Sequence, residues 1–339
     1  MEEQITIKLL DETSVDDQIK IYAESFGYRG SIDKLKEFWM EKHFNNPIDK
    51  SAIFGAYVND ELAGINAYTP MDYSYTGRVI HVVQSCESGV AVKFRRRGIW
   101  VKIVTYAMEY FKKEGKYEAV IGFPNYRNSY PGFVKMGWLT LFNEENMLMI
   151  NNGPAVFGAK FPKAISWIGK LAELQKIPMS FKSKKSKYIV EKVESLKLEM
   201  ENDDKISLNL SEKWFDWKIG YKNHDLYSVR EDDKIVAGFV VEKNGLDGVR
   251  YLKLIKGFNY CDDNKVYREA FIAFVEFVFK NREISLLRIW TTEMDKYKKL
   301  GFIHMKSHVN PYIVYPLNED SRELLTDPEK WSVGLLDLD

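Results

Sequence analysis

The two halves of this 339-residue chain repeat one sequence pattern. An apolar run, a polar turn and a second run ending in Ala-Gly occupy 53–64, and the pattern returns at 226–238. The segment 135–138 (Lys-Met-Gly-Trp) returns as Lys-Leu-Gly-Phe at 299–302. Both repeats are separated by about half the chain, a spacing that favours two copies of one fold.

The repeat suggests how the chain is divided. We predict an N-terminal domain at 1–152, a helical and lysine-rich connector at 153–204, and a C-terminal domain at 205–339. Apolar residues between 155 and 174 recur at roughly helical spacing, which predicts a helix that docks between the halves. The stretch 175–187 has five lysines and no acid, a composition typical of an exposed linker.

Composition and charge exclude several classes of protein. Hydrophobic residues make up 45% of the chain, enough for a core, and the 49 basic residues balance the 49 acidic ones. Broad nucleic-acid binding needs a basic excess, so we expect no nucleic-acid partner. No segment is long and apolar enough to span a bilayer, and the N-terminus lacks the layout of a secretion signal. Two distant cysteines, Cys86 and Cys261, suit reduced thiols. We therefore expect a cytoplasmic protein with no membrane partner.

A strand, a basic turn and a helix follow one another in the first half. The apolar run 79–92 predicts a strand, and the helical pattern that begins at Gly98 ends before Gly115. Between them lies Arg95-Arg96-Arg97-Gly98. A glycine turn that opens a helix directs backbone N–H groups and the helix dipole at one point, where phosphates bind well. We read the half as an α+β arrangement with one crossover helix.

The loop Arg95-Arg96-Arg97-Gly98-Ile99-Trp100 resembles the Arg/Gln-x-x-Gly-x-Gly/Ala pyrophosphate loop of the GNAT N-acetyltransferases. Trp100, in place of the last small residue, and Gly122-Phe123-Pro124-Asn125 resemble a branch associated with polysaccharide and amino-sugar biosynthesis. The resemblance implies an α+β fold of two GNAT-like domains, each a mixed, mostly antiparallel sheet flanked by helices. It also implies acetyl-CoA as co-substrate, with its pantetheine arm between the strands that end near Val92 and Phe123.

The resemblance further implies which residues hold the cofactor. Asn125 and Asn128 are among them, because an asparagine of relatives hydrogen-bonds the cofactor, but both suit a turn beside Pro124 equally well. The full set of implied cofactor contacts is Val90, Ala91, Val92, Arg95, Arg96, Arg97, Gly98, Ile99, Trp100, Asn125, Asn128 and Phe133.

Acetyl transfer to an amine needs a base and a proton for the leaving thiolate. Glu87, on the strand expected to line the site, is our candidate base, with an exposed strand glutamate as the alternative. Relatives often use a tyrosine as the acid, but this chain has Phe133 there, so Tyr130 is our candidate, with Tyr126 or water as the alternatives. The five histidines form no ligand spacing, and we expect no metal.

The second half contains no Arg-x-x-Gly loop between 257 and 268. We therefore predict a degenerate copy that shapes the acceptor pocket. The partners expected are a coenzyme A thioester and a small amine, bound by a monomer or homodimer. Six aromatic residues favour an amino sugar if they stack on a ring, but they suit a core equally well: Trp39, Tyr68, Tyr73, Tyr75, Trp214 and Trp217.

Other readings stay open at this stage. The acceptor is alternatively a peptide, a polyamine or a drug amine. An aminoacyl transferase that uses charged tRNA is disfavoured by the intact loop and the neutral charge. A CoA-binding or interaction module without activity is consistent with Phe133.

Overall fold

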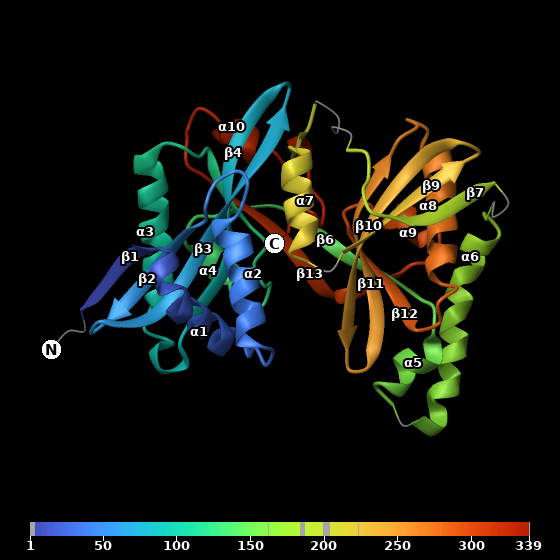
Figure 1. Cartoon of the computed structure of the whole chain (residues 1–339), viewed down its shortest axis with the longest axis horizontal. Helices are drawn as coiled ribbons and strands as arrows, with labels where there is room; N and C mark the ends of the chain where they lie inside the picture. The colour runs from blue at the N-terminus through green and yellow to red at the C-terminus, as the bar shows by residue number, and fades with distance from the viewer. Residues whose placement is uncertain (1–3, 162, 184–186, 199–203, 223, 339) are drawn as a thin grey trace.

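The computed structural model describes residues 4–161, 163–183, 187–198, 204–222 and 224–338. Its two halves lie side by side, and one continuous sheet runs through both (Figure 1). The strand order of the main path is β1-β2-β3-β4-β5-β13-β6-β12-β11-β10-β9-β7. The fold is α+β, as the sequence predicts.

The first half follows the predicted order of elements. Gly27 and Gly115, both in the left-handed region, end α1 and α3, and the Ser31 side chain caps α2. The elements are β1 (Ile5–Leu10), α1 (Val15–Phe26), α2 (Ile32–Phe44), β2 (Ala52–Val58), β3 (Glu61–Tyr75), β4 (Arg78–Val90), α3 (Ile99–Glu114), β5 (Ala119–Gly122), α4 (Tyr130–Lys135) and β6 (Leu139–Ile150).

The second half repeats that order from its third strand onward, but before it one helix takes the place of α1 and α2 and a short extra strand is added. A connecting segment of α5 (Gly153–Gly158), the 3₁₀ helix η3 (Lys163–Lys176) and α6 (Ile177–Ser180) precedes it. Its elements are β7 (Tyr188–Val193), β8 (Ile206–Leu208), α7 (Glu212–Gly220), β9 (His224–Glu231), β10 (Lys234–Leu246), β11 (Val249–Asn259), α8 (Asn264–Val278), β12 (Ile284–Thr291), α9 (Met294–Lys298) and β13 (Ile303–Pro316), followed by α10 (Arg322–Thr326) and β14 (Trp331–Ser332).

The repeat extends to single hydrogen bonds. Gly137 and Gly301 both adopt positive φ, 86° and 97°, just after a short helix. The amide of Trp138 then donates to Phe133 O at 3.2 Å, and the amide of Phe302 donates to Tyr297 O at 3.1 Å. The same cap therefore ends α4 and α9, which explains why Lys-x-Gly-aromatic recurs.

The two halves exchange their last long strand. β5 pairs not with β6 of its own half but with β13, which joins Gly122 to Ile313. β6 in turn pairs with β12 of the second half, joining Leu148 to Arg288, and β6 and β13 pair with each other. Each half thus completes the sheet of the other, and the predicted boundary near residue 152 follows a strand that lies in the second half's sheet.

Helices cover the first sheet on both faces, as alternation along the strands requires. The rings of Phe54 and Tyr68 contact Phe111 of α3, with centroids 5.8 and 5.2 Å apart. The neighbouring Thr69 instead hydrogen-bonds Ser51, whose hydroxyl lies 3.0 Å from His43 of α2. We call the α2 face the front and the α3 face the back.

One sequence prediction needs correction in the fold, and the fold decides an alternative that the sequence left open. The segment after residue 153 does not dock between the halves, because it lies along the outer edge of the second half (Figure 1). Of the six aromatic residues proposed to stack on a sugar, five are buried in the cores and only Tyr75 is partly exposed. The buried five are Trp39, Tyr68, Tyr73, Trp214 and Trp217.

Candidate functional site

The start of α3 carries the predicted loop. Gly98 is the N-cap residue with φ 72°, and no side chain caps this helix end. Arg96 also lies in the left-handed region, at φ 63°. Buried Phe94 and Ile99 fix the loop on both sides. The first-turn amides of α3 thus form an anion-binding end of a helix that the chain's own side chains leave uncapped.

The three arginines of the loop are all exposed, but they make different contacts. Arg95 Nε donates to Val90 O at 3.0 Å. Arg97 donates to Lys93 O at 3.1 Å and its guanidinium lies over the Phe94 ring. Arg95 and Arg97 therefore hold the shape of the loop, and Arg96 projects from its tightest point.

β4 and β5 separate on the way to this loop. Their parallel pairing begins at Val82–Ala119 and ends at Ser85–Gly122. Beyond Ser85, β4 continues to Val90 along β3 alone. The amide of Ala91 donates to Ala63 O of β3 at 2.9 Å, so by alternation the N–H of Val90 points away from β3 and into the gap. This gap can accept an extended amide chain.

A β-bulge lies beside the gap. Ile65 pairs with Gly89 but Ala67 pairs with Cys86, so Glu87 and Ser88 together oppose one residue of β3. Glu87 adopts φ 41°, a strained value for a non-glycine residue. Gly89 immediately follows the bulge. The bulge turns the Glu87 side chain toward α2.

Glu87 contacts two side chains of α2. Lys42 Nζ donates to its Oε1, and His43 Nε2 lies 3.6 Å from its Oε2. Lys42 is 1% exposed and Glu87 10%, so this ion pair is almost closed to water. His43 then continues through Ser51 to Thr69, and Thr69 lies 3.3 Å from the Cys86 thiol. Sequence reasoning missed Lys42 and His43, because adjacent polar residues in a helix resemble a solvated surface.

The loop after β5 places the remaining predicted residues. Asn125 Oδ1 accepts from the amides of Arg127 and Asn128, at 3.1 and 3.2 Å, so this asparagine closes a turn. Tyr130 begins α4, and its hydroxyl lies 2.9 Å from Thr140 Oγ1. The Tyr130 hydroxyl and Asn125 Oδ1 therefore already have hydrogen-bond partners within the protein.

Trp100 packs on α4 and does not block the helix start. Its ring lies edge-on to Phe133, with centroids 4.9 Å apart, and it covers Gly132, where a Cβ would collide with it. The aromatic residue at the last loop position and the phenylalanine at the tyrosine position therefore form one packed unit between α3 and α4.

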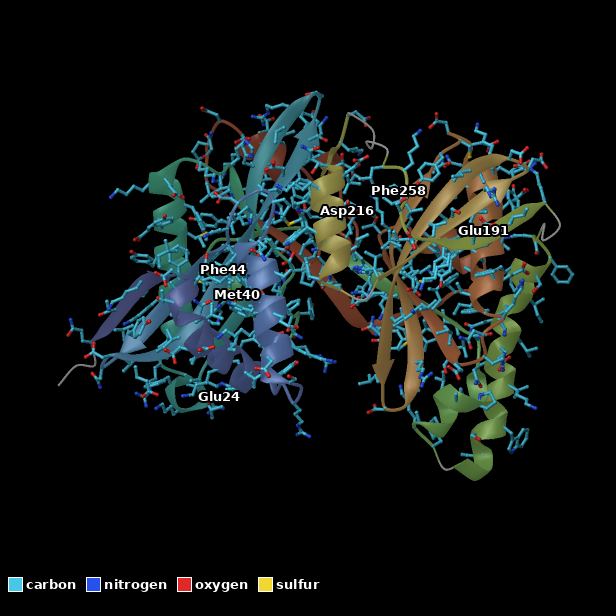
Figure 2. The ribbon with its side chains drawn as sticks, viewed as in Figure 1. Glu24, Met40, Phe44, Glu191, Asp216 and Phe258 are labelled. Carbon is cyan, nitrogen blue, oxygen red and sulfur yellow. The ribbon has the colours of Figure 1, made fainter. Side chains whose placement is uncertain are left out.

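Val92, by contrast, already has a carboxylate partner. Its amide donates to Glu24 of α1 at 2.8 Å. Figure 2 places Glu24 at the lower edge of the N-terminal half. An acid therefore lies at the edge of the predicted phosphate site.

A cavity of about 560 Å³ opens beside the end of β5 and is shared by the two halves. Phe123 and Asn125 line it from the first half, and Trp290 from the second. Asn310, on the exchanged strand β13, lies opposite Glu144 of β6. Strand exchange therefore brings a polar wall from both halves to the mouth of the β4–β5 gap.

Glu144 is a second feature that sequence reasoning missed. Its side chain is buried, and its Oε2 has no hydrogen-bond partner. Burial, followed by the charge of Asp337, raises the pKa of Glu144 to about 8. Nothing in the local sequence Asn-Glu-Glu-Asn signals this burial, which arises from the exchanged strands and from the C-terminal segment.

Comparison with known families identifies the first half. Residues 6–140 match the family model described as an acetyltransferase (GNAT) domain. Residues 6–140 are therefore similar to a GNAT acetyltransferase domain. The GNAT match covers β1 through α4, including the α3 loop and the β4–β5 gap. The match therefore concerns this segment of the chain, and the second half is outside it.

Solved structures resemble the whole chain. A GCN5-related N-acetyltransferase from Anabaena variabilis has a TM-score of 0.59 at 11% identity, covering 93% of this chain and 73% of that one. A tandem GNAT protein from the clavulanic acid biosynthesis pathway has 0.59 at 10% identity, covering 93% and 99%. The N-myristoyltransferase of Saccharomyces cerevisiae with bound myristoyl-CoA has 0.55 at 11%, covering 92% and 82%. At these identities the likeness concerns the fold.

A sequence search of curated proteins gave no match. Within the described residues, no group of three or more His, Cys, Asp or Glu side chains could hold a metal ion. The described part of the chain also contains no helix with the length and apolar character needed to cross a membrane.

Proposed function

We propose that this GNAT protein transfers the acetyl group of acetyl-CoA directly to the amine of a small acceptor. One observation carries the proposal: the uncapped start of α3 lies at the end of a gap between β4 and β5. Pyrophosphate needs the helix end and Arg96, and pantetheine amides need an open strand edge. The two requirements meet at Val90–Gly98.

The Val90 N–H supplies the first chemical contribution. The thioester carbonyl gains negative charge as the amine attacks, and a backbone donor aimed into the gap stabilises that charge. The amine nitrogen bonds to the carbonyl carbon, and the carbon–sulfur bond then breaks. No covalent intermediate on the protein is needed.

Glu87 is the proposed base. It takes the proton that the amine loses, directly or through water, and Lys42 and His43 hold its carboxylate in one orientation. The leaving thiolate takes a proton from Tyr130 or from water. Tyr130 lies close enough to the β5 loop to serve, because its amide bonds Asn125 O at 3.1 Å.

The acceptor is proposed to enter the cavity of about 560 Å³ at the end of β5. The amides of Asn125 and Asn310 suit hydroxyl groups, and Trp290 offers a flat ring for an apolar sugar face. This favours an amino sugar or a nucleotide-linked amino sugar. A peptide, polyamine or drug amine is the second candidate, and a CoA-binding module without activity is the third.

The test is release of free thiol from acetyl-CoA in the presence of an amine panel that contains glucosamine, spermidine and a short peptide. We expect release above the rate of hydrolysis, fastest with the amino sugar. Glu87→Gln should lower kcat by about 100-fold or more, the usual contribution of general-base catalysis. Glu61→Gln, an exposed glutamate paired with Lys93, is the matched control and should leave kcat unchanged.

The outcomes separate the candidates. Tight acetyl-CoA binding with no thiol release for any amine would favour the inactive module. Release with spermidine or peptide alone would move the acceptor class and keep the enzyme. An unchanged pH profile and rate in Glu87→Gln would remove Glu87 from the mechanism.

A further inference from the structure

The helix η3 exposes a continuous apolar stripe. Ile165, Ile168, Leu171, Leu174 and Ile177 recur every three residues, and they are 43, 37, 62, 57 and 47% exposed. In a 3₁₀ helix, side chains three residues apart lie directly above one another. The four residues within η3 therefore form a single ridge that faces solvent, and Ile177, the first residue of α6, continues it.

The opposite side of η3 is the side that packs, so the orientation of the ridge is fixed. Gly169 approaches the backbone of Gly153 so closely that a Cβ would collide with it. Glu173 accepts from the Gly153 amide at 2.9 Å and from Arg282 at 2.8 and 3.0 Å. These contacts tie η3 to α5 and to the turn before β12, and they leave the apolar side outward.

Three further large apolar side chains are exposed near the ridge. Trp167 is 64% exposed, and Phe161 and Phe181, at its two ends, are 50% and 87% exposed. We call these three residues and the ridge together the outer patch. Figure 1 shows the backbone from α5 to α6 at the lower outer edge of the second half. An apolar patch of this extent marks a surface that contacts something other than water.

The segment that carries the outer patch is strongly basic in sequence. Residues 153–187 hold eight lysines and one acid, Glu173, a net charge of +7 in a chain whose total is zero. Lys170 and Lys182 are exposed, and Lys182 reaches across to Lys299 O at 2.7 Å, whereas Lys187 pairs with Glu231 at 2.8 Å. The partner of the patch should therefore be anionic as well as apolar.

An anionic lipid surface meets both requirements. Two copies of the chain that met patch to patch would bring two +7 segments together, and a nucleic acid would leave Trp167 and Leu171 in water. A bilayer with anionic headgroups takes up the apolar ridge below the headgroups and the lysines among them. We propose that the outer patch lies on the surface of an anionic membrane and anchors the protein there reversibly.

This inference does not depend on acetyl transfer. The expectation of no membrane partner rests on the lack of a spanning segment, and a helix that lies in the interface needs no such length. Vesicle binding is measured without acetyl-CoA, so failure of the proposed reaction and failure of this proposal are separate results.

The experiment is cosedimentation of the full chain with vesicles of phosphatidylcholine, with or without one-third phosphatidylglycerol. We expect binding to the anionic vesicles that weakens with added salt. The double variant Leu171→Ser/Leu174→Ser should bind at least about tenfold more weakly, because binding no longer removes two exposed leucine side chains from water. Lys170→Gln should weaken binding about fivefold, as one lysine near a charged surface contributes about 1 kcal/mol.

The matched control is Leu246→Ser, a leucine 64% exposed on the β10–β11 turn outside the patch. It should bind like the unmodified protein. The proposal is overturned if the unmodified protein ignores anionic vesicles, if the Leu171/Leu174 variant binds them equally well, or if Leu246→Ser loses as much. Lipid-free dimers that the double variant abolishes would instead assign the patch to a second copy.

Discussion

The helices α3 and α8 occupy matching places in the two halves, yet their N-termini differ in one decisive respect. Gly98 begins α3 with no side-chain cap. Asp263 begins α8, and its carboxylate accepts from the amides of Lys265 and Val266 at 2.7 and 3.3 Å. The second half therefore supplies its own anion at the point where the first half leaves donors for a phosphate.

The neighbouring gap differs in the same sense. In the second half, the hydroxyl of Tyr267 on the first turn of α8 lies against Gly257 of β11, in the space a Cβ would need. In the first half the β4–β5 ladder ends at Ser85, just as the β11–β12 ladder of the second half ends at Lys253. The halves therefore share the separated strands and differ at the helix N-terminus and in the tyrosine against Gly257, which is how a duplicated domain can keep its shape and lose its ligand.

The largest effect is expected when the two halves are separated, which tests whether they are independent folding units. Because β5 pairs with β13 and β6 with β12, residues 1–152 expressed alone should not fold cooperatively or bind acetyl-CoA. Coexpression with residues 153–339 should restore both. Circular dichroism and titration with acetyl-CoA measure this, and a soluble, binding-competent 1–152 fragment would show that the strand exchange is dispensable.

The second test concerns the shared centre between the halves. Glu144 has a pKa raised to about 8, so the folded state holds its proton more tightly than the unfolded state does. The stability from this proton is complete near pH 4 and is lost as pH rises toward 8, by at most about 1.4 kcal/mol per pH unit. Glu144→Gln keeps a neutral side chain at every pH. The free energy of unfolding of this variant should therefore rise relative to that of the unmodified protein as pH rises.

Urea unfolding at about pH 5 and about pH 8 measures this difference. The control is Glu145→Gln. It removes a carboxylate from the next residue of β6, where Glu145 lies 2.8 Å from His304. An advantage of Glu144→Gln that stays constant with pH would mean that Glu144 is ionised in the folded protein.

The third test converts the open helix end into the filled one. Gly98→Asp places a carboxylate at the N-cap of α3, as Asp263 does at α8. The acid should occupy the free amides and repel pyrophosphate, which lowers acetyl-CoA affinity by about 100-fold, ~2.7 kcal/mol. Gly98→Asn is the control, since asparagine also tolerates positive φ without adding charge.

Isothermal titration of both variants gives the answer. An affinity in Gly98→Asp equal to that of the unmodified protein would exclude the α3 N-terminus from the cofactor site. Equal losses in the two variants would indicate that the backbone, and not the charge, is responsible.

The smallest effect is expected from Glu24, whose role near α3 is compared with that of Asp263 at α8. Glu24 bonds the amide of Val92 in the loop and leaves the helix end open. Glu24→Gln should therefore raise acetyl-CoA affinity only modestly, by up to about 1 kcal/mol, the size of one screened charge interaction. A large gain would mean that Glu24 blocks the site in the way Asp263 does, and a loss would mean that it supports the loop.

The elements that depend on local sequence were predictable. The strand, basic turn and helix at 79–114 formed as expected, because the glycines at 98 and 115 and the apolar face of α3 lie within one continuous segment. The recurrent Lys-x-Gly-aromatic segment also marked the repeat correctly, since the helix cap it encodes involves only six residues.

Features that depend on distant pairing were not predictable. β6 and β13 read as ordinary strands, and nothing within them specifies that each completes the other half's sheet. The burial of Glu144 and the ion pair of Glu87 with Lys42 follow from such long-range contacts. The helix after residue 153 was placed between the halves because apolar spacing predicts a buried face, whereas its apolar ridge faces outward.

A crystal structure of the full chain with acetyl-CoA tests the central claim most directly. We expect the pyrophosphate at the first-turn amides of α3 beside Arg96, and the thioester between β4 and β5 near the Val90 N–H. Density for the cofactor at α8, or anywhere away from Gly98, would contradict this assignment of the open and filled halves.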